Sequence, residues 1–440
     1  MSLLDPEAET ETVDQATTSV GAPTASASDL SQLDRGHFWH SFTQMGDYEP
    51  LVIERAEGVW LHTADGRRLL DGASSMWCNV HGHNHPAINA AIREQLDRVA
   101  HCTSLGMGCD TTVRLAKRLA DVAPGNLTRV LFSSDGSSAI EVALKAAFQY
   151  WRQCERPQPR RSKFLAFGNA YHGDTIGAAS VGGIDRFHAL FTPLLFDAVR
   201  APAPDRDALP GDVNEADAAA HYLRQVEAVF DEHGESLAAV VIEPLVQCAA
   251  GMVMHPEGFL RGLRELCDRH GVLLILDEIA VGFGKTGTLF ACEQEGVTPD
   301  FLCVGKGLTG GYLPMAATIT SDRVYEAFLG ELSSGRQLYH GHTFCGNPLA
   351  ASAALACLDV FDREQTLTAL PEKTALIDAH LARLQENPAV ARVRQRGIIA
   401  ALDFEPSSGV CGRDVAARAL QHGVWLRPQP HMLYAMPPLS

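Results

Sequence analysis

The sequence has no long apolar run and no excess of basic residues. Its longest apolar runs, such as Val272–Leu276, are far shorter than the roughly 20 residues that a helix needs to cross a bilayer. With 36 Lys and Arg residues against 53 Asp and Glu residues, the formal charge is −17. We therefore expect neither a nucleic acid nor an anionic membrane as a partner, because neither polyanion is attracted to such a chain.

Basic residues are also missing from residues 1–34, which are acidic and rich in Ala, Ser and Thr. This stretch has too few large apolar side chains to offset the entropy lost on ordering. It also lacks the basic start and apolar middle of a signal peptide. We predict that residues 1–34 form a disordered acidic tail.

Paired cysteines are absent as well. The eleven cysteines are scattered, and no two of them form a Cys-x-x-Cys pair. Such a distribution is typical of reduced core thiols, and it favours a cytoplasmic protein over a disulfide scaffold or a zinc site.

Apolar β-rich runs alternate with amphipathic helices from about residue 86 onward. This alternation predicts an α/β fold with a mostly parallel sheet and helices on both sides. A chain of 440 residues is long enough for more than one domain. We expect a large domain over residues 74–358 and a small α+β domain from residues 35–73 and 359–440. The expected strands are Arg129–Phe132, Phe164–Phe167, Ala239–Ile242, Val272–Leu276 and Phe301–Val304, and the clearest helices are Ala139–Trp151, Pro348–Phe361 and Lys373–Gln385.

A lysine and a carboxylate each follow one of these strands. Lys306 stands among glycines just after Phe301–Val304, and Asp277 ends the run Val272–Leu276. A buried lysine loses its proton more readily and becomes a nucleophile, and a buried carboxylate needs a partner. Pyridoxal phosphate (PLP) offers that partner, because an adjacent Asp stabilises its protonated ring nitrogen. The alternatives are a surface lysine in a Gly-rich turn and an Asp that caps a helix.

The segment Ser133–Ser138 lies between an expected strand and an expected helix. Gly136 allows a tight turn, and the helix N-terminus supplies amide hydrogens and positive potential for a phosphate. Ser137 adds a hydroxyl. Simple helix capping would use the same residues. Tyr171, just after another strand, is placed to cover a flat pyridine ring.

Several other motifs are weaker. Gly305–Gly310 matches the dinucleotide pattern G-x-G-x-x-G, but Pro314 stands where the required helix should continue. Gly282–Gly287 contains Gly-Lys-Thr without the leading glycine of a P-loop. No Gly-x-Ser-x-Gly elbow of a serine hydrolase occurs. A metal site is also disfavoured, because no carboxylate or Cys accompanies the loop histidines His81, His83 and His85.

With Lys306, Asp277, Gly136 and Tyr171 in this order, the chain resembles the class III aminotransferases of PLP fold type I, over about His37–Pro438. The narrowest segments, Thr-Gln-Met and Ser-Ser-x-Trp, resemble the branch that converts 8-amino-7-oxononanoate (KAPA) to 7,8-diaminononanoate in biotin synthesis. The matching segments are His40–Met45, Asp71–Trp77, Gln149–Trp151, Tyr171–Thr175, Asp277–Ala280, Leu289–Glu293 and His340–Phe344.

The resemblance implies a role for each of these residues. Lys306 would bind PLP covalently and move the proton, Asp277 would pair with the ring nitrogen, and Tyr171 would stack on the ring. Gly136 and Ser137 would bind the phosphate. In a homodimer, Thr343 would reach the phosphate of the neighbouring subunit. The implied substrate contacts are Phe42, Trp77, Asp174 and Arg427, of which Arg427 suits the KAPA carboxylate.

Departures from the family pattern concern the amino donor. Phe42 stands for the more usual Tyr, Met76 for a Trp and Lys285 for an Arg. Most members use S-adenosylmethionine, whereas Gly311–Pro314 and His342 resemble a branch that uses lysine. Both small-molecule donors stay open. The alternative function is that of another class III enzyme, which acts on ω-amino acids or diamines with pyruvate.

Overall fold

The computed structural model describes residues 26–440, which form two compact units. One unit contains the chain up to Glu54 and His62–Arg67, and the other contains Arg55–Leu61 and Arg68–Ser440. The first unit holds helix α1 (Ala27–His37), which begins with a capping box between Ser26 and Asp29. Of the tail expected over residues 1–34, residues 1–25 lie outside the described residues, and residues 27–34 belong to α1 instead. The proposed division into a large and a small domain stays a prediction.

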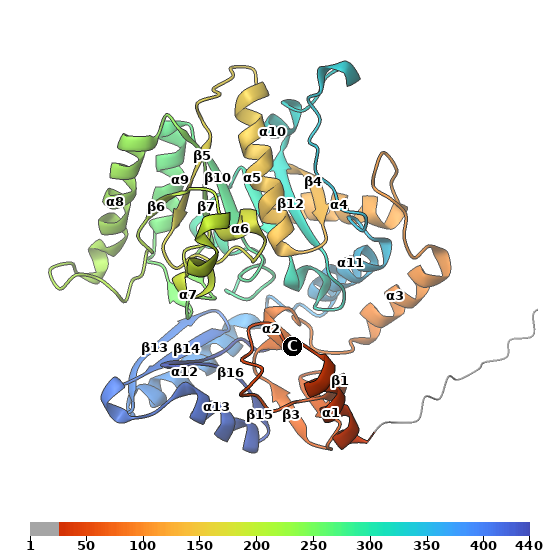
Figure 1. The fold of residues 1–440 in the computed structure, drawn as a ribbon, viewed down its shortest axis with the longest axis vertical. Coiled ribbons are helices and arrows are strands. Elements are labelled where there is room, and N and C mark those ends of the chain that lie inside the picture. The colour runs from red at the N-terminus through yellow and green to blue at the C-terminus, as the bar shows by residue number, and fades with distance from the viewer. Residues whose placement is uncertain (1–25) are drawn as a thin grey trace, which may run out of the picture. The chain divides into compact units, whose positions relative to one another are not determined.

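A seven-stranded sheet forms the centre of the second unit (Figure 1). Its strands are β4 (Leu127–Ser133), β5 (Lys163–Phe167), β6 (Val199–Ala201), β7 (Leu237–Ile242), β10 (Leu273–Asp277), β11 (Phe301–Val304) and β12 (Ala316–Ser321). They follow the order β4-β12-β11-β10-β7-β5-β6. Only β12 is antiparallel to its neighbours, which are β11 and β4. The predicted mostly parallel sheet and its five expected strands are therefore confirmed.

Strand β10 shows why these runs are apolar throughout. Leu274 and Leu276 belong to the core on one face of the sheet, and Leu273 and Ile275 belong to the core on the other. Side chains alternate between the faces of a strand, so a strand covered on both faces needs apolar residues at every position. Each such buried side chain contributes about 1.5–3 kcal/mol relative to an exposed one.

Helices supply both cores. Helix α5 (Gly136–Gln153) packs on one face of the sheet, and α8 and α9 lie side by side in the other layer (Figure 1). The apolar side chains Ile140, Leu144, Phe148 and Trp151 recur at helical spacing along α5. Ile140, Leu144 and Trp151 are buried, but Phe148 is 39% exposed. Besides α5, the helices between residues 86 and 363 are α3 (Pro86–Arg98), α4 (Asp110–Val122), α6 (Ile176–Ser180), α7 (Asp185–His188), α8 (Ala218–His233), α9 (Phe259–His270), α10 (Asp322–Glu326) and α11 (Pro348–Arg363). Within residues 26–440, none of the helices is both long enough and apolar enough to cross a bilayer.

The C-terminal part of the second unit forms a four-stranded antiparallel sheet. Its order is β13-β14-β17-β16. Along the chain, α12 (Leu370–Gln385) precedes β13, and α13 (Gly412–Gln421) lies between β14 and β16. Helices α11 and α12 confirm the two predicted after residue 347. The strands of this sheet are β13 (Val390–Arg396), β14 (Ile399–Phe404), β16 (Arg427–Gln429) and β17 (Met432–Ala435). The remaining strands of the described chain are β1 (Ile53–Glu57), β2 (Trp60–Thr63), β3 (Arg68–Asp71), β8 (Val246–Gln247), β9 (Val253–Met254) and β15 (Val424–Trp425).

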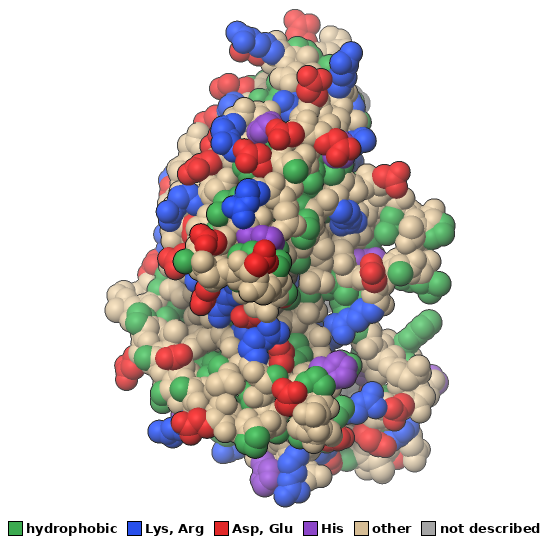
Figure 2. All heavy atoms as spheres, turned by 90° about the vertical axis from the view of Figure 1, so that its left-hand side faces the viewer, with side chains coloured by type: hydrophobic (Ala, Val, Ile, Leu, Met, Phe, Trp, Pro, Cys, Tyr) green, Lys and Arg blue, Asp and Glu red, His purple; other side chains and the backbone are tan. Residues whose placement is uncertain are grey.

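Charged side chains of both signs intermingle on the face of the molecule that Figure 2 shows. The net charge of −17 is therefore not gathered into one patch on that face. A mixed surface of this kind offers no extended track for a polyanion.

His255 gives the fold a measurable sensitivity to acid. Its ring is buried, and neither ring nitrogen has a hydrogen-bond partner within residues 26–440. Burial lowers the pKa of His255 to about 3. The pKa of histidine in an unfolded chain is about 6.5. Below that pH, His255 therefore binds a proton in the unfolded state but not in the folded state. The stability that a neutral His255 contributes is present above pH 6.5 and is lost as the pH falls toward 3.

We therefore expect His255→Leu to resist acid better than the wild-type protein. Between pH 7 and pH 5 its free energy of unfolding should rise relative to wild type by about 2 kcal/mol, at about 1.4 kcal/mol per pH unit below 6.5. Urea unfolding at the two pH values measures this difference. His422→Leu, at an exposed histidine, is the control. A difference that is the same at both pH values would contradict the prediction.

Candidate active site

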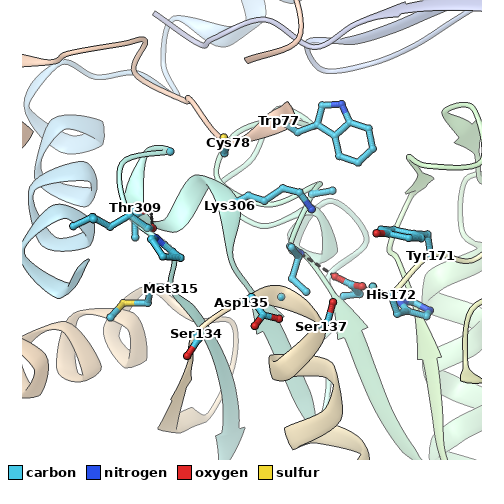
Figure 3. A pocket seen from close by; sticks show the side chains of 18 of the residues that line it. Trp77, Cys78, Ser134, Asp135, Ser137, Tyr171, His172, Lys306, Thr309 and Met315 are labelled. Carbon is cyan, nitrogen blue, oxygen red and sulfur yellow. Dashed lines mark hydrogen bonds and ion pairs between the residues drawn. The ribbon is translucent and has the colours of Figure 1, made fainter. Parts of the chain in front are cut away.

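A cavity of about 390 Å³ lies where the parallel strands end (Figure 3). Its walls come from the residues after β4, β5, β7, β10 and β11, together with Trp77 and the loop before β12. The carboxyl edge of an open α/β sheet is where ligands bind. Figure 3 shows Lys306, Tyr171 and Ser137 around this space.

Lys306 and Asp277 meet at this edge because their strands are neighbours. β10 and β11 pair in parallel, with Asp277 opposite Cys303, and Lys306 follows two residues after β11. Lys306–Thr309 form a 3-10 helix with Gly310 as its C-cap, and the next element of the chain is β12. No α-helix starts here, so the segment does not have the strand–turn–helix structure that a dinucleotide-binding loop requires. The amine of Lys306 lies 5.4 Å from the centre of the Trp77 ring.

Both oxygens of the Asp277 carboxylate are held. Oδ2 is 2.8 Å from Nδ1 of His172, and Oδ1 accepts a hydrogen bond from the amide of Ile279 at 3.1 Å. The Ile279 contact closes a turn and not a helix, so Asp277 is not a helix cap. His172 is fully buried, and its Nε2 has no partner among the described residues. Since Nδ1 donates to the carboxylate, Nε2 of the neutral ring is the proton-free nitrogen.

Sequence analysis missed a second buried carboxylate at this edge, Glu243. It follows β7 and accepts hydrogen bonds from the amides of Tyr171 (3.1 Å) and Cys248 (3.2 Å). Burial, reinforced by the nearby charge of Asp277, raises the pKa of Glu243 well above its ordinary value. The pattern that identified Asp277, a carboxylate directly after a buried apolar strand, could have identified Glu243 too.

The N-terminus of α5 points into the cavity. The Asp135 carboxylate caps this helix by accepting from the amide and the hydroxyl of Ser138, at 2.9 and 2.8 Å. Ser138 is thus occupied by the cap, whereas Gly136 and Ser137 line the cavity. Gly173 lets the next loop approach: its φ is +119°, and a Cβ there would lie 1.8 Å from Oγ of Ser137. The helix end is both capped and available to an anion.

Tyr171 forms a fixed aromatic wall. Its hydroxyl donates to Asp174 at 2.7 Å. The His188 ring lies nearly parallel to the Tyr171 ring, with a centroid distance of 6.3 Å and an interplanar angle of 4°. Burial and the hydrogen bond to Asp174 raise the pKa of the Tyr171 phenol above its ordinary value, so the phenol stays protonated at neutral pH.

Trp77 reaches the cavity from a strained turn. The short helix α2 (Ser74–Trp77) is left-handed, with φ values of 49°, 46°, 76° and 72°. Its hydrogen bonds run from Trp77 N to Ala73 O (2.8 Å) and from Cys78 N to Ser74 O (3.0 Å). Left-handed helical backbone costs residues other than glycine about 1–2 kcal/mol each. No sequence pattern predicts such a turn, because it contains no glycine.

The other predicted substrate contacts differ in their placement. Arg427, on β16, is half-buried, and its Nη1 donates to Sδ of Met76 at 2.8 Å. Within residues 26–440, no carboxylate forms an ion pair with Arg427. Thr343 lies in an exposed loop and does not line the cavity. Phe42 belongs to the first compact unit, so its contact with a substrate stays a prediction.

The groups around the cavity fit PLP. An amine is present for its aldehyde, a carboxylate for its ring nitrogen and a helix N-terminus for its phosphate. The carboxylate cannot swing away, because His172 and Ile279 hold it. Lys306, Asp277 and the N-terminus of α5 could therefore hold this cofactor.

Comparisons with known proteins agree with this chemistry. Residues 43–440 match the family model of aminotransferase class-III. The adenosylmethionine-8-amino-7-oxononanoate aminotransferase of Nitratidesulfovibrio vulgaris is 50% identical over 93% of this chain and 78% of that protein. The enzyme of the same name from Geobacter sulfurreducens is 47% identical over 93% of each chain.

Solved structures share the fold. The crystal structure of the adenosylmethionine-8-amino-7-oxononanoate aminotransferase of Methanocaldococcus jannaschii superposes with a TM-score of 0.87 at 39% identity, over 93% of this chain and 94% of that one. An (S)-enantioselective omega-transaminase from Thermomicrobium roseum gives 0.89 at 33% identity over 95% of each. The chain belongs to the class III aminotransferases and is a PLP-dependent aminotransferase with the type I fold.

Proposed function

We propose that this aminotransferase converts KAPA to 7,8-diaminononanoate in biotin synthesis, with S-adenosylmethionine or lysine as the amino donor. The relatives from Nitratidesulfovibrio and Geobacter, whose names state this acceptor, support the proposal, because they match 93% of the chain. All eleven cysteines are free thiols, which supports a reducing, cytoplasmic location.

The placement of Arg427 is the observation that supports KAPA as the acceptor. KAPA ends in a carboxylate, which a guanidinium binds through two parallel hydrogen bonds. The charge of Arg427 is close enough to Tyr171 to act on the pKa of its phenol, and Arg427 contacts Met76 beside Trp77. A half-buried cation without a carboxylate partner in the described chain is thus available next to the cavity.

The residues around the cavity have different roles in the proposed reaction. Lys306 would hold the cofactor covalently, and its amine would move the proton at the reacting carbon. Asp277, held in place by His172, would pair with the ring nitrogen. PLP, when bound, supplies the electron sink for both half-reactions. Tyr171 would contact the ring, Gly136 and Ser137 would contact the phosphate, and Trp77 and Asp174 would contact the substrates.

Replacing Arg427 with glutamine tests the acceptor site. We expect Arg427→Gln to raise the KM for KAPA about 10- to 100-fold, because a hydrogen bond to a charged group contributes about 1.5–3 kcal/mol. The KM for an acceptor without a carboxylate should change little. Steady-state kinetics with both acceptors measure the contrast, and Arg418→Gln, on the exposed side of α13, is the control. Equal effects on both acceptors would contradict the assignment.

A second candidate is an ω-transaminase that uses pyruvate, since the Thermomicrobium roseum structure has the same fold at 33% identity. An acceptor panel with KAPA and pyruvate separates the two functions. Mixing the PLP-loaded enzyme with S-adenosylmethionine or with lysine, without acceptor, identifies the donor. The true donor removes the visible absorption band of the bound cofactor in a single turnover.

We also infer that the active form is a homodimer in which Thr343 reaches the phosphate site of the partner subunit. The exposed loop around Thr343 supports this inference, because it displays Tyr339 (71% exposed) and Phe344 (61% exposed). Large exposed apolar side chains that cluster in this way mark association surfaces. Light scattering that found a fully active monomer would contradict the dimer.

A further inference from the structure

The left-handed turn α2 needs support from outside itself. Four consecutive residues, Ser74–Trp77, have positive φ values, and none of them is glycine. Glycine tolerates such backbone, but a Cβ brings every other residue too close to the following carbonyl. Strained backbone of this kind persists only when its surroundings over-determine it. The contacts of the turn therefore show what keeps it in place.

One support comes from Asp71, which is buried just before the turn. Its Oδ1 accepts from the amide of Ala73, and its Oδ2 accepts from the hydroxyl of Ser75, both at 3.1 Å. His83 lies 2.9 Å from the same Oδ2. These contacts hold the start of the turn.

The second support is Lys285, which is only 1% exposed. Its Nζ donates to Oγ of Ser74 at 2.9 Å and to the carbonyl of Pro437 at 3.0 Å. The Ser74 hydroxyl donates its single proton to the carbonyl of Met436 at 2.6 Å, so its oxygen is left to accept from the lysine. Lys285 thereby ties the turn to the C-terminal segment.

These contacts explain why a lysine is buried in an apolar interior. Burial lowers the pKa of Lys285 to about 7. The amine keeps at least two N–H donors in both protonation states, so both hydrogen bonds persist whether or not it is charged. Trp77 and Cys78 line the cavity, whereas Lys285 does not, so Lys285 acts on the cavity only through the turn.

We propose that Lys285 is a positioning residue for the aminotransferase reaction: its hydrogen bonds to Ser74 and Pro437 hold the left-handed turn that places Trp77 against Lys306. The proposal deepens the proposed function and relies on its role for Lys306. Without the lysine, the Ser74 oxygen and the Pro437 carbonyl lose a buried donor, and the turn relaxes toward ordinary backbone. Trp77 then leaves its place 5.4 Å from the Lys306 amine.

Lys285→Met removes the donor and keeps the length of the side chain. In the PLP-loaded protein we expect kcat to fall about 10- to 100-fold, the range set by leaving a buried acceptor unpaired. The fluorescence of Trp77, obtained by difference from a Trp77→Phe counterpart, should change as well. Borohydride should still fix a pyridoxyl group on Lys306, because the lysine and its strand are untouched. Unchanged kcat and unchanged Trp77 fluorescence would overturn the proposal.

The chain offers a matched control in Lys373. Its Nζ also donates to the C-terminal segment, at the carbonyl of Leu439, but it does not touch the turn. Lys373→Met should keep both kcat and the fluorescence of Trp77. Equal losses in Lys373→Met and Lys285→Met would overturn the proposal, because loosening the C-terminal segment would then be sufficient.

A rescue experiment separates positioning from general stability. Ser75 is exposed with a φ of 46°, so glycine there lowers the cost of the left-handed backbone. Glycine at this position also removes the hydroxyl that donates to Asp71, so Ser75→Gly alone serves as the reference. In that background Lys285→Met should lose much less kcat and much less of the Trp77 signal than it loses in the wild-type protein. An equal loss in both backgrounds overturns the proposal.

Two further outcomes are informative. If Lys285→Met does not fold, Ser74→Ala removes the acceptor and leaves the lysine in place, and the same two measurements then decide. Lost KAPA turnover with unchanged Trp77 fluorescence overturns the positioning role. Altered Trp77 fluorescence in a protein that never aminates KAPA supports the positioning role and counts against the proposed substrate.

Discussion

The variant Lys306→Ala is expected to lose at least about 10⁴-fold in kcat. Proton transfer by a positioned side chain alone contributes about 10²–10⁴-fold, and this variant also loses the covalent attachment of the cofactor. Borohydride reduction followed by mass spectrometry should find a pyridoxyl group at position 306 in the wild-type protein and none in the variant. The visible absorption of the purified protein should disappear together with that modification.

Lys117→Ala provides the control for this experiment. Lys117 is exposed on α4, pairs with Asp121 and does not line the cavity. It should keep the colour and the turnover of the wild-type enzyme. Normal turnover in Lys306→Ala would sink the assignment of Lys306, and with it the mechanism above.

Asp277→Asn is expected to slow the reaction about 10²- to 10³-fold, while the cofactor stays bound. A neutral amide fills nearly the same space but no longer stabilises a positive charge on the ring nitrogen, and removing one preorganised electrostatic contact costs about this much. The kcat of the PLP-loaded variant, compared with its cofactor content, measures the effect. A loss of PLP with unchanged kcat per bound cofactor would contradict the electron-sink role.

The matched control is Asp268→Asn. Asp268 lies on the exposed side of α9, where it pairs with Arg264 at 2.6 Å. This exposed ion pair contributes little to stability, so the variant should be kinetically normal. A comparable loss in both variants would show that the effect of Asp277→Asn is not specific to the site.

Much of the site could be predicted because it lies at the ends of strands. A continuous apolar run must be a strand buried on both faces, and the residue that follows it must emerge at an edge of the sheet. Asp277 and Lys306 both follow such runs, so their shared edge could be inferred from the chain alone. Glu243 obeys the same rule, because it directly follows the apolar strand β7.

Other features leave no local signal. The left-handed turn at Ser74–Trp77 is made of residues that do not favour positive φ. Two of its hydrogen-bond partners, Lys285 and Met436, are more than 200 residues away along the chain. The exposure of Phe148 also has no signal in the local sequence. The periodicity of apolar residues identifies one face of a helix, but it does not show how much of that face other elements cover. The pairing of His172 with Asp277 likewise joins the loop after β5 to the last residue of β10.

The reversed direction of β12 has a consequence for how this enzyme could diversify. The strands β4, β5, β7, β10 and β11 deliver cavity residues from their carboxyl ends. Strand β12 runs the other way and begins at that edge, so the chain must cross the rim between Gly310 and Met315 before the strand starts. Tyr312, Leu313 and Pro314 of this crossing line the cavity. Lengthening or recomposing the crossing would reshape the compartment while every strand pairing stayed intact. New substrate ranges could therefore arise there without disturbing the framework.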